Sequence, residues 1–221
     1  MNIMEHIINV SADIYLSEAA KKNHKPGLLL IGAEGSPFLR SLNRVARGYA
    51  GYDSIILNHL PSKIENCKVI IDKETCMGVT SLPAEADVDN LYNPGTSCVA
   101  EATYNLIDDM TDIDGKAVTI VGRGHATKGL ADKLVKKGAT VTIAHSRTKQ
   151  LFGAMYDRDI VVLATPTISD IPQADMVIDI GNALTKDIRK ELPANCLYVD
   201  KIGKLTNAIL LARAAGVYRE R

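Results

Sequence analysis

The residues AVTIV at 117–121 run directly into the glycine-rich loop GRGHATKG at 122–129. Five consecutive apolar or β-branched residues predict a strand that is buried on both faces, as the strands of parallel sheets are. Helical spacing then predicts a helix over Ala126–Lys136, with Gly138 as its stop. A strand, a glycine-rich loop and a helix in this order are typical of dinucleotide-binding α/β units.

The loop itself has the composition of a phosphate-binding loop. The backbone N–H groups of Gly122, Arg123, Gly124, His125 and Ala126 can hold a pyrophosphate, and the glycines let a ligand approach the backbone closely. The dinucleotide fingerprint places its third glycine at position 127, where this chain has threonine. The loop alone is therefore compatible with a cofactor site and with an ordinary turn between a strand and a helix.

The end of the next strand favours one form of the cofactor. The predicted strand Thr140–Ala144 is followed by His145, Ser146, Arg147 and Thr148. Sites for NAD typically carry an acidic residue about 20 positions after the loop, which binds the ribose 2′-hydroxyl. A hydroxyl and a guanidinium are instead suited to a 2′-phosphate, and the arginine of the loop can add a second guanidinium. We therefore predict NADP as the cofactor, the alternative being a solvated polar loop.

The rest of the chain predicts an α/β fold with two α/β domains, the C-terminal one a Rossmann-type parallel sheet that carries the NADP site. The predicted boundaries are 1–111 for an N-terminal substrate and catalytic domain, 112–204 for the NADP-binding domain, and 205–221 for a terminal helix that packs back on the N-terminal domain. Apolar runs predict strands at 28–31, 54–57, 68–71, 160–164 and 176–180, and helical spacing predicts helices near 39–46, 97–110, 148–155 and 205–215. The segment 74–95 reads as irregular.

The first residues predict a packing helix. Ile3, Ile7, Val10 and Ile14 follow helical spacing, and the polar run 21–25 before a proline ends the pattern.

Composition narrows the class of protein. Twenty-six basic residues balance 26 acidic ones, so no overall field attracts nucleic acid or an anionic membrane. No apolar run approaches the roughly 20 residues of a membrane span. We expect a cytoplasmic protein with reduced thiols and no metal site, because the four cysteines form no CxxC pair, the histidines have no metal-ligand spacing, and the first residues do not read as a signal peptide.

Taken together, these segments resemble the bifunctional methylenetetrahydrofolate dehydrogenase/cyclohydrolase family. In the C-terminal half, the chain is similar to the family's dGK…viGRS, ATVTxxHSxT, ADI and VIDVG segments at 113–123, 139–148, 159–162 and 177–181. In the N-terminal half, it is similar to PxLAxixVG, VQLPLP, KDVDG and PxTP at 26–32, 81–83, 87–89 and 93–96. Residues 202–206 resemble the end of the family's PVPGGVGPMT segment.

The resemblance implies an oxidoreductase of one-carbon metabolism that binds NADP along its C-terminal domain and a reduced folate between its domains, as a homodimer. It assigns cofactor contacts to Thr96, Gly122, Arg123, Gly124, His125, Ala126, His145, Ser146, Arg147, Thr148, Ala164, Thr165, Pro166, Gly181, Asn182 and Thr206. It assigns substrate contacts to Asp87, Asp89, Arg40, Gly203 and Thr206, and catalytic positions to Asp89, Arg44 and Ser81.

Several of these positions depart from the family's pattern. Where the family carries a tyrosine and a lysine four residues apart, this chain has Arg40 and Arg44, and Ser81 stands at the glutamine of VQLP. An arginine stays protonated and cannot shuttle a proton, which argues against cyclohydrolase activity. Asp89 matches the family's folate-binding aspartate, with a turn-forming aspartate as the alternative. Two other functions therefore stay open: an NADP-binding protein without folate catalysis, and a dehydrogenase for a different small substrate.

Overall fold

The computed structural model describes residues 3–76 and 78–220, and its chain divides into two compact units. One unit comprises Val99–Gly203 together with the start of the first helix, up to Ile8. The other comprises Asn9–Cys98 and the chain from Lys204 onward. Both units are α/β with parallel sheets, so the predicted fold class is confirmed.

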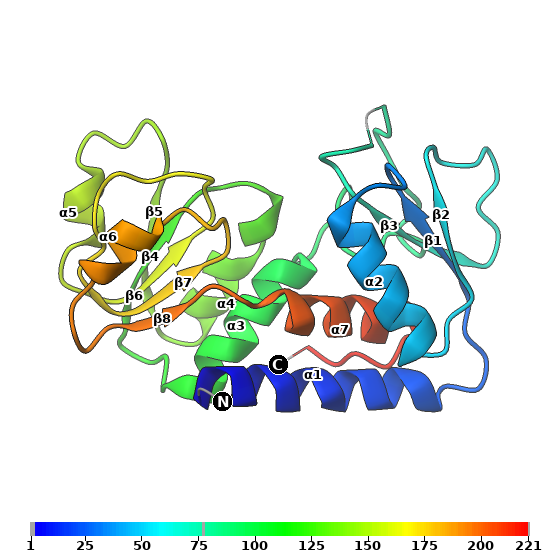
Figure 1. Ribbon diagram of the computed structural model, residues 1–221, viewed down its shortest axis with the longest axis horizontal. Helices are drawn as coiled ribbons and strands as arrows, with labels where there is room; N and C mark the ends of the chain where they lie inside the picture. The colour runs from blue at the N-terminus through cyan, green and yellow to red at the C-terminus, as the bar shows by residue number, and fades with distance from the viewer. Residues whose placement is uncertain (1–2, 77, 221) are drawn as a thin grey trace. The chain divides into compact units, whose positions relative to one another are not determined.

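The first of these units is built on a five-stranded parallel sheet in the order β5-β4-β6-β7-β8 (Figure 1). Its elements are α3 (Cys98–Met110), β4 (Ala117–Val121), the 3₁₀ turn η1 (His125–Thr127), α4 (Leu130–Lys136), β5 (Thr140–Ala144), α5 (Leu151–Met155), β6 (Arg158–Leu163), β7 (Ala174–Asp179), α6 (Lys186–Lys190) and β8 (Leu197–Val199). The chain leaves β4 for β5 on one side and returns to form β6 on the other. Ligands of open α/β sheets bind at such a reversal of strand order, outside the carboxyl ends of the strands.

Helices cover this sheet on both faces. Val121, Val161, Leu163 and Val177 form one buried cluster with Met155 of α5, and Ile188 of α6 packs against it. Figure 1 shows α4 on the opposite face, and its Leu130 and Leu134 are fully buried. Burial on both faces explains why β4, β6 and β7 are nearly continuous apolar runs.

An ion pair joins the amino ends of β4 and β6 within this unit. Lys116 Nζ lies 2.8 Å from Asp159 Oδ1, and the N–H of Ala117 donates to Asp159 Oδ2 at 2.8 Å. The hydrogen bonds from Lys116 and from the N–H of Ala117 lower the pKa of the Asp159 carboxyl. The hydrogen bond to Asp159 and the negative charge of this carboxylate raise the pKa of Lys116. These residues therefore tie the central strands together at the edge opposite the loops.

The second unit contains a three-stranded parallel sheet in the order β2-β1-β3. Its elements are β1 (Gly27–Ile31), α2 (Pro37–Gly48), β2 (Ser54–Leu57), β3 (Cys67–Ile71) and α7 (Gly203–Ala214). The first helix, α1 (Ile3–Lys21), is divided between the two units after Ile8. Leu39, Leu42 and Ala46 of α2 are buried, and Ser36 caps this helix through its Oγ. The terminal helix packs within this unit, where the hydroxyl of Tyr52 donates to the carbonyl of Leu211 at 3.3 Å.

The irregular segment after β3 forms much of the core of this unit. Cys76, Leu82 and Ala86 pack in one buried cluster with Ile31 and Val69 of the sheet. Residue 87 pairs with residue 69 as a single parallel bridge, so the segment extends the sheet by one short step. The expectation of an irregular segment is confirmed, and its apolar side chains stabilise this unit by packing against the sheet.

The first helix forms as predicted, but three of the four residues that carry the predicted spacing are exposed. Ile3, Val10 and Ile14 are 68%, 45% and 53% exposed, whereas Ala12 and Ala19 are fully buried. Apolar residues stand on more than one side of α1, so their spacing did not identify the face that packs. The buried residues Met4, Ile8, Ala12, Leu16 and Ala19 form a second apolar series at helical spacing, and this series is the one that packs.

Two further differences concern short elements. The predicted helix from Ala126 is interrupted, because Gly129 has a left-handed φ of 81° between η1 and α4. The short elements α6 and β8 were missed, since five and three residues are too few for a clear periodicity.

Candidate functional site

A cavity of about 370 Å³ opens at the carboxyl ends of β4, β5 and β6. This is the point where the strand order reverses, and the residues that meet there come from three loops. The cavity contains eight of the residues predicted for the cofactor: Gly122, Arg123, His145, Ser146, Arg147, Ala164, Thr165 and Pro166. The other lining residues are Val121, Leu151 and Thr167, so the lining includes two arginines and no carboxylate.

Two glycines hold the loops of this edge close together. A Cβ on Gly122 would lie 2.5 Å from the carbonyl oxygen of Ala164, and a Cβ on Gly181 would lie 2.1 Å from that of Thr165. Both distances are shorter than any real Cβ contact, so neither position tolerates a side chain without a backbone shift. The loops after β4, β6 and β7 are therefore in backbone contact with one another.

A threonine braces the glycine-rich loop. The Thr127 side chain is buried, and its hydroxyl lies 3.3 Å from the carbonyl of Gly122 and 3.2 Å from that of Gly124. A Cβ on Gly124 would meet no atom within 4 Å, so the backbone there faces open space. The threonine at the position of the fingerprint's third glycine thus fixes the loop and leaves Gly124 open to a ligand. Of the other predicted loop residues, His125 and Ala126 lie in the 3₁₀ turn and do not line the cavity.

The loop after β5 presents its side chains outward. The N–H of His145 donates to Thr148 Oγ1 at 2.9 Å, and the N–H of Arg147 donates to His145 Nδ1 at 3.1 Å. Thr148 therefore holds the turn and does not line the cavity. Ser146 and Arg147 are exposed, and across residues 3–76 and 78–220 neither side chain has a hydrogen-bond or ion-pair partner. A second guanidinium, that of Arg123, is equally exposed at the same cavity.

The loop after β7 is held by a buried carboxylate. Asp179 is fully buried, and its Oδ1 accepts the N–H of Ala183 at 2.7 Å. Its Oδ2 accepts the N–H of Leu184 at 3.0 Å and the hydroxyl of Tyr198 at 2.9 Å. Burial and the hydrogen bond to Asp179 raise the pKa of Tyr198 above its ordinary value. Gly181 and Asn182, both predicted cofactor residues, lie in the turn that Asp179 holds.

The aspartates predicted for the substrate both make local hydrogen bonds in the second unit. Asp87 is buried, and its carboxylate accepts the N–H groups of Leu91, Tyr92 and Asn93 at 2.9, 2.8 and 3.2 Å. Asp89 Oδ1 accepts the N–H of Cys98, the first residue of α3, at 2.6 Å. Asp87 thus braces a turn, and Asp89 caps a helix.

The other predicted residues of the substrate side lie in different surroundings. Arg40 and Arg44 lie one turn apart on the exposed face of α2, and within the described chain neither guanidinium has a partner. Ser81 is exposed in the irregular segment. Thr96 and Thr206 are buried, and Gly203 begins α7.

Sequence reasoning missed a buried carboxylate at the end of β3. Asp72 Oδ2 accepts the hydroxyls of Ser36 and Thr75 at 2.6 and 2.8 Å, and Oδ1 accepts the N–H of Glu74 at 3.1 Å. Its signal was available, because Asp72 is the first polar residue after the apolar run of β3. Tyr198 was missed together with its strand.

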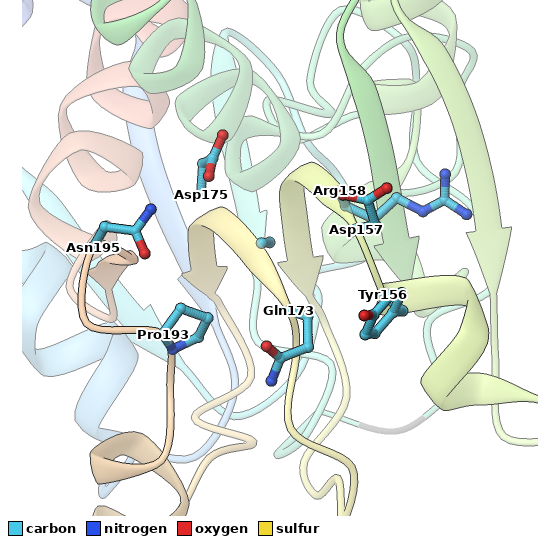
Figure 2. A pocket seen from close by; sticks show the side chains of 8 residues that line it. Tyr156, Asp157, Arg158, Gln173, Asp175, Pro193 and Asn195 are labelled. Carbon is cyan, nitrogen blue, oxygen red and sulfur yellow. The ribbon is translucent and has the colours of Figure 1, made fainter.

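A second pocket of about 220 Å³ lies at the opposite, amino edge of the five-stranded sheet. Figure 2 shows side chains from the turns before β6 and β7, from the first residues of these strands and from the loop before β8. It contains no residue predicted for the cofactor or the substrate. Because the glycine-rich loop lies at the carboxyl edge, the 370 Å³ cavity is the candidate site.

Residues 3–76 and 78–220 include no group of three or more histidine, cysteine, aspartate or glutamate side chains placed to hold a metal ion. None of the helices that they form has the length and apolar character needed to cross a membrane.

Comparison with known proteins connects this geometry to a family. Residues 97–218, more than half of the chain, match the profile of the tetrahydrofolate dehydrogenase/cyclohydrolase NAD(P)-binding domain. The bifunctional protein FolD of Thermotoga sp. (strain RQ2) is 28% identical over 193 residues, covering 77% of this chain and 68% of that protein.

Solved structures show the same fold over nearly the whole chain. The bifunctional FolD of Campylobacter jejuni has a TM-score of 0.74 at 15% identity, covering 97% of this chain and 96% of that one. The Trypanosoma brucei FolD complexed with NADP cofactor and inhibitor has a TM-score of 0.72 at 20% identity, covering 95% and 93%.

Proposed function

Because this chain belongs to the tetrahydrofolate dehydrogenase/cyclohydrolase family, we propose that it is an NADP-dependent methylenetetrahydrofolate dehydrogenase. The observation that carries this proposal is the cavity at the strand-order reversal, which contains Arg123 and Arg147 and no carboxylate. The related Trypanosoma brucei structure, described as complexed with NADP, supports the same cofactor.

The residues of the cavity fit such a cofactor. The open backbone at Gly124 gives room for a pyrophosphate beside the loop N–H groups, and Ser146, Arg147 and Arg123 would hold the 2′-phosphate. Ala164, Thr165 and Pro166 would lie along the ligand beyond the loop. When bound, the nicotinamide accepts the hydride, so the protein has to supply position and electrostatics and needs no strong acid or base.

The substrate in this proposal is a reduced folate that carries a one-carbon unit. We assign its binding to Asp89, Asp87, Arg40, Gly203 and Thr206 by their resemblance to the family. Asp89 is the strongest of these, because the carboxylate of Asp87 already accepts three backbone N–H groups.

We expect NADP to bind at least tenfold more tightly than NAD. One charge-assisted bond to the 2′-phosphate contributes on the order of 1.5–3 kcal/mol, and a tenfold difference requires about 1.4 kcal/mol. Titration calorimetry of the two cofactors measures the ratio, and Arg147→Ala should reduce it while leaving the Kd for NAD unchanged. Lys149→Ala, at an exposed cation outside the cavity lining, is the matched control. Equal affinities of the wild-type protein for NADP and NAD would contradict the cofactor assignment.

We expect cyclohydrolase activity to be absent or very weak. Arg40 and Arg44 stand near the family's tyrosine and lysine positions, and a guanidinium does not release a proton at neutral pH. Hydrolysis of methenyltetrahydrofolate, followed directly and beside the dehydrogenase reaction of the same preparation, tests this. Robust hydrolysis would show that the proton-transfer group lies elsewhere in the chain.

A second candidate is an NADP-binding protein without folate catalysis. The same departures, Arg40, Arg44 and Ser81, favour it, because all three lie at positions where the family carries catalytic groups. NADP binding without turnover of any reduced folate distinguishes it from the dehydrogenase, and turnover of another substrate identifies a dehydrogenase of different specificity.

The cellular location, oligomeric state and partners of this enzyme are also proposals. We assign it to the cytoplasm as a homodimer without nucleic-acid or membrane partners, from the family resemblance, the balanced charge and the four free cysteines. Sedimentation equilibrium of the purified protein tests the dimer.

A further inference from the structure

Tyr198 is linked through Asp179 to the turn after β7, at the carboxyl edge of the five-stranded sheet. It lies on the edge strand β8, and its hydroxyl donates to Oδ2 of the fully buried Asp179 at 2.9 Å. The same oxygen accepts the N–H of Leu184, the last residue of the turn after β7. A side chain on an edge strand therefore shares an acceptor with the backbone of this turn.

Arg189 connects the same turn to the same tyrosine. Its Nε donates to the carbonyl of Leu184 at 3.0 Å, and its guanidinium carbon lies 4.8 Å from the centre of the Tyr198 ring. Its Nη1 donates to Asp200 at 2.8 Å, just beyond β8. Two independent contacts thus link β8 to the end of the turn.

The start of the turn is fixed from β6. The N–H groups of Ile180 and Gly181 both donate to the carbonyl of Leu163, at 2.8 and 3.0 Å. Gly181 leaves no room for a Cβ against Thr165, and Asn182 has a left-handed φ of 53°. A turn clamped at both ends, with a non-glycine residue in the left-handed region, is held in one conformation by its surroundings.

The order of the strands places this turn along the cofactor. The side chains suited to the 2′-phosphate follow β5, and the glycine-rich loop suited to the pyrophosphate follows β4. A dinucleotide bound in that direction extends over the end of β6 toward the end of β7, where Gly181 and Asn182 lie. The turn therefore faces the nicotinamide half of the ligand.

We propose that Tyr198 is a positioning residue for the nicotinamide: through Asp179, its hydroxyl fixes the Gly181–Asn182 turn against that half of NADP. The inference rests on the proposed function and extends it to a residue that does not itself contact the cofactor. Tyr198→Phe removes only the hydroxyl and keeps the ring beside Arg189.

The test compares two ligands on one variant. Tyr198→Phe should weaken NADP binding by about tenfold, the scale of one hydrogen bond to a charged group. It should leave the Kd of adenosine 2′,5′-bisphosphate, which lacks the nicotinamide, within about twofold. Tyr156→Phe is the matched control, since Tyr156 is 56% exposed and lies at the pocket of the opposite edge (Figure 2).

Other results would overturn the proposal. Equal weakening of both ligands would show a general structural defect, and no weakening of either would show that the hydroxyl does not position the turn. If Tyr198→Phe fails to fold, Arg189→Gln, which removes the other link to the turn, should weaken NADP selectively and by a smaller factor. If the wild-type protein binds NADP no more tightly than the bisphosphate, the nicotinamide half contributes no affinity and this inference is refuted. If the wild-type protein binds neither ligand, the proposed function itself is refuted.

Discussion

Asp89→Asn is expected to lower kcat/KM for methylenetetrahydrofolate by about 30- to 1000-fold, with little change in NADP affinity. A carboxylate can accept two N–H donors from the amino-pyrimidine edge of a pterin, whereas an amide offers one acceptor and turns a donor toward the ligand. Losing such a pair costs roughly 2–4 kcal/mol in transition-state binding. Steady-state kinetics beside an NADP titration of the same variant measures both quantities.

The structure makes this substitution a sharp test. Asp89 Oδ1 caps α3 through the N–H of Cys98, and asparagine caps a helix about as well as aspartate does. The variant should therefore fold normally, so a kinetic defect reports on the substrate. Asp53→Asn, at a side chain that is 96% exposed in the same unit, is the control. Unchanged kcat/KM in the Asp89 variant would show that this residue only caps α3, and it would weaken the folate assignment.

Lys133→Met is expected to destabilise the NADP-binding unit by about 3–5 kcal/mol, the cost of removing one partner from a buried ion pair. Lys133 Nζ of α4 lies 2.5 Å from Oε1 of Glu101 of α3, and their side chains are only 12% and 0% exposed. The same ammonium lies 4.8 Å from the centre of the Tyr104 ring. Urea denaturation of the variant and the wild-type protein measures the loss.

A neighbouring pair supplies the control. Lys137 also joins α4 to α3, 3.1 Å from Asp108, but its side chain is 47% exposed. Lys137→Met should therefore cause only a small part of the loss, because solvent screens exposed pairs. Replacing Lys133 and Glu101 together by methionine should recover stability, since no buried charge is then left. Equal effects of the two single lysine variants would contradict the burial argument.

Most of the residues proposed for the cofactor could be predicted to lie together, because their signals are local. The apolar run of β4, the glycines of the loop and the residues after β5 stand next to one another in the sequence, and the parallel sheet brings their strand ends to one cavity. The bracing role of Thr127 was not predicted, because it depends on the path of the loop around the hydroxyl. The need for a glycine at position 181 was not predicted either, because it arises from the close approach of the Thr165 backbone in three dimensions.

The substrate side could be predicted less well, because polar residues in turns serve two purposes. Asp87 and Asp89 are two positions apart, yet one accepts a set of backbone N–H groups and the other caps a helix. Asp72 followed an apolar strand, but its partners Ser36 and Thr75 come from separate segments. The buried face of α1 could not be predicted for a related reason, since more than one apolar series follows helical spacing along this helix.

Reduction of NADP by methylenetetrahydrofolate, followed by the absorbance of NADPH, tests the central claim most directly. The wild-type protein should form NADPH, with a kcat/KM for NADP at least tenfold above that for NAD. The Arg147→Ala variant should lose most of this preference. A protein that binds NADP in a titration, yet forms no NADPH with this folate, would contradict the assignment as a methylenetetrahydrofolate dehydrogenase.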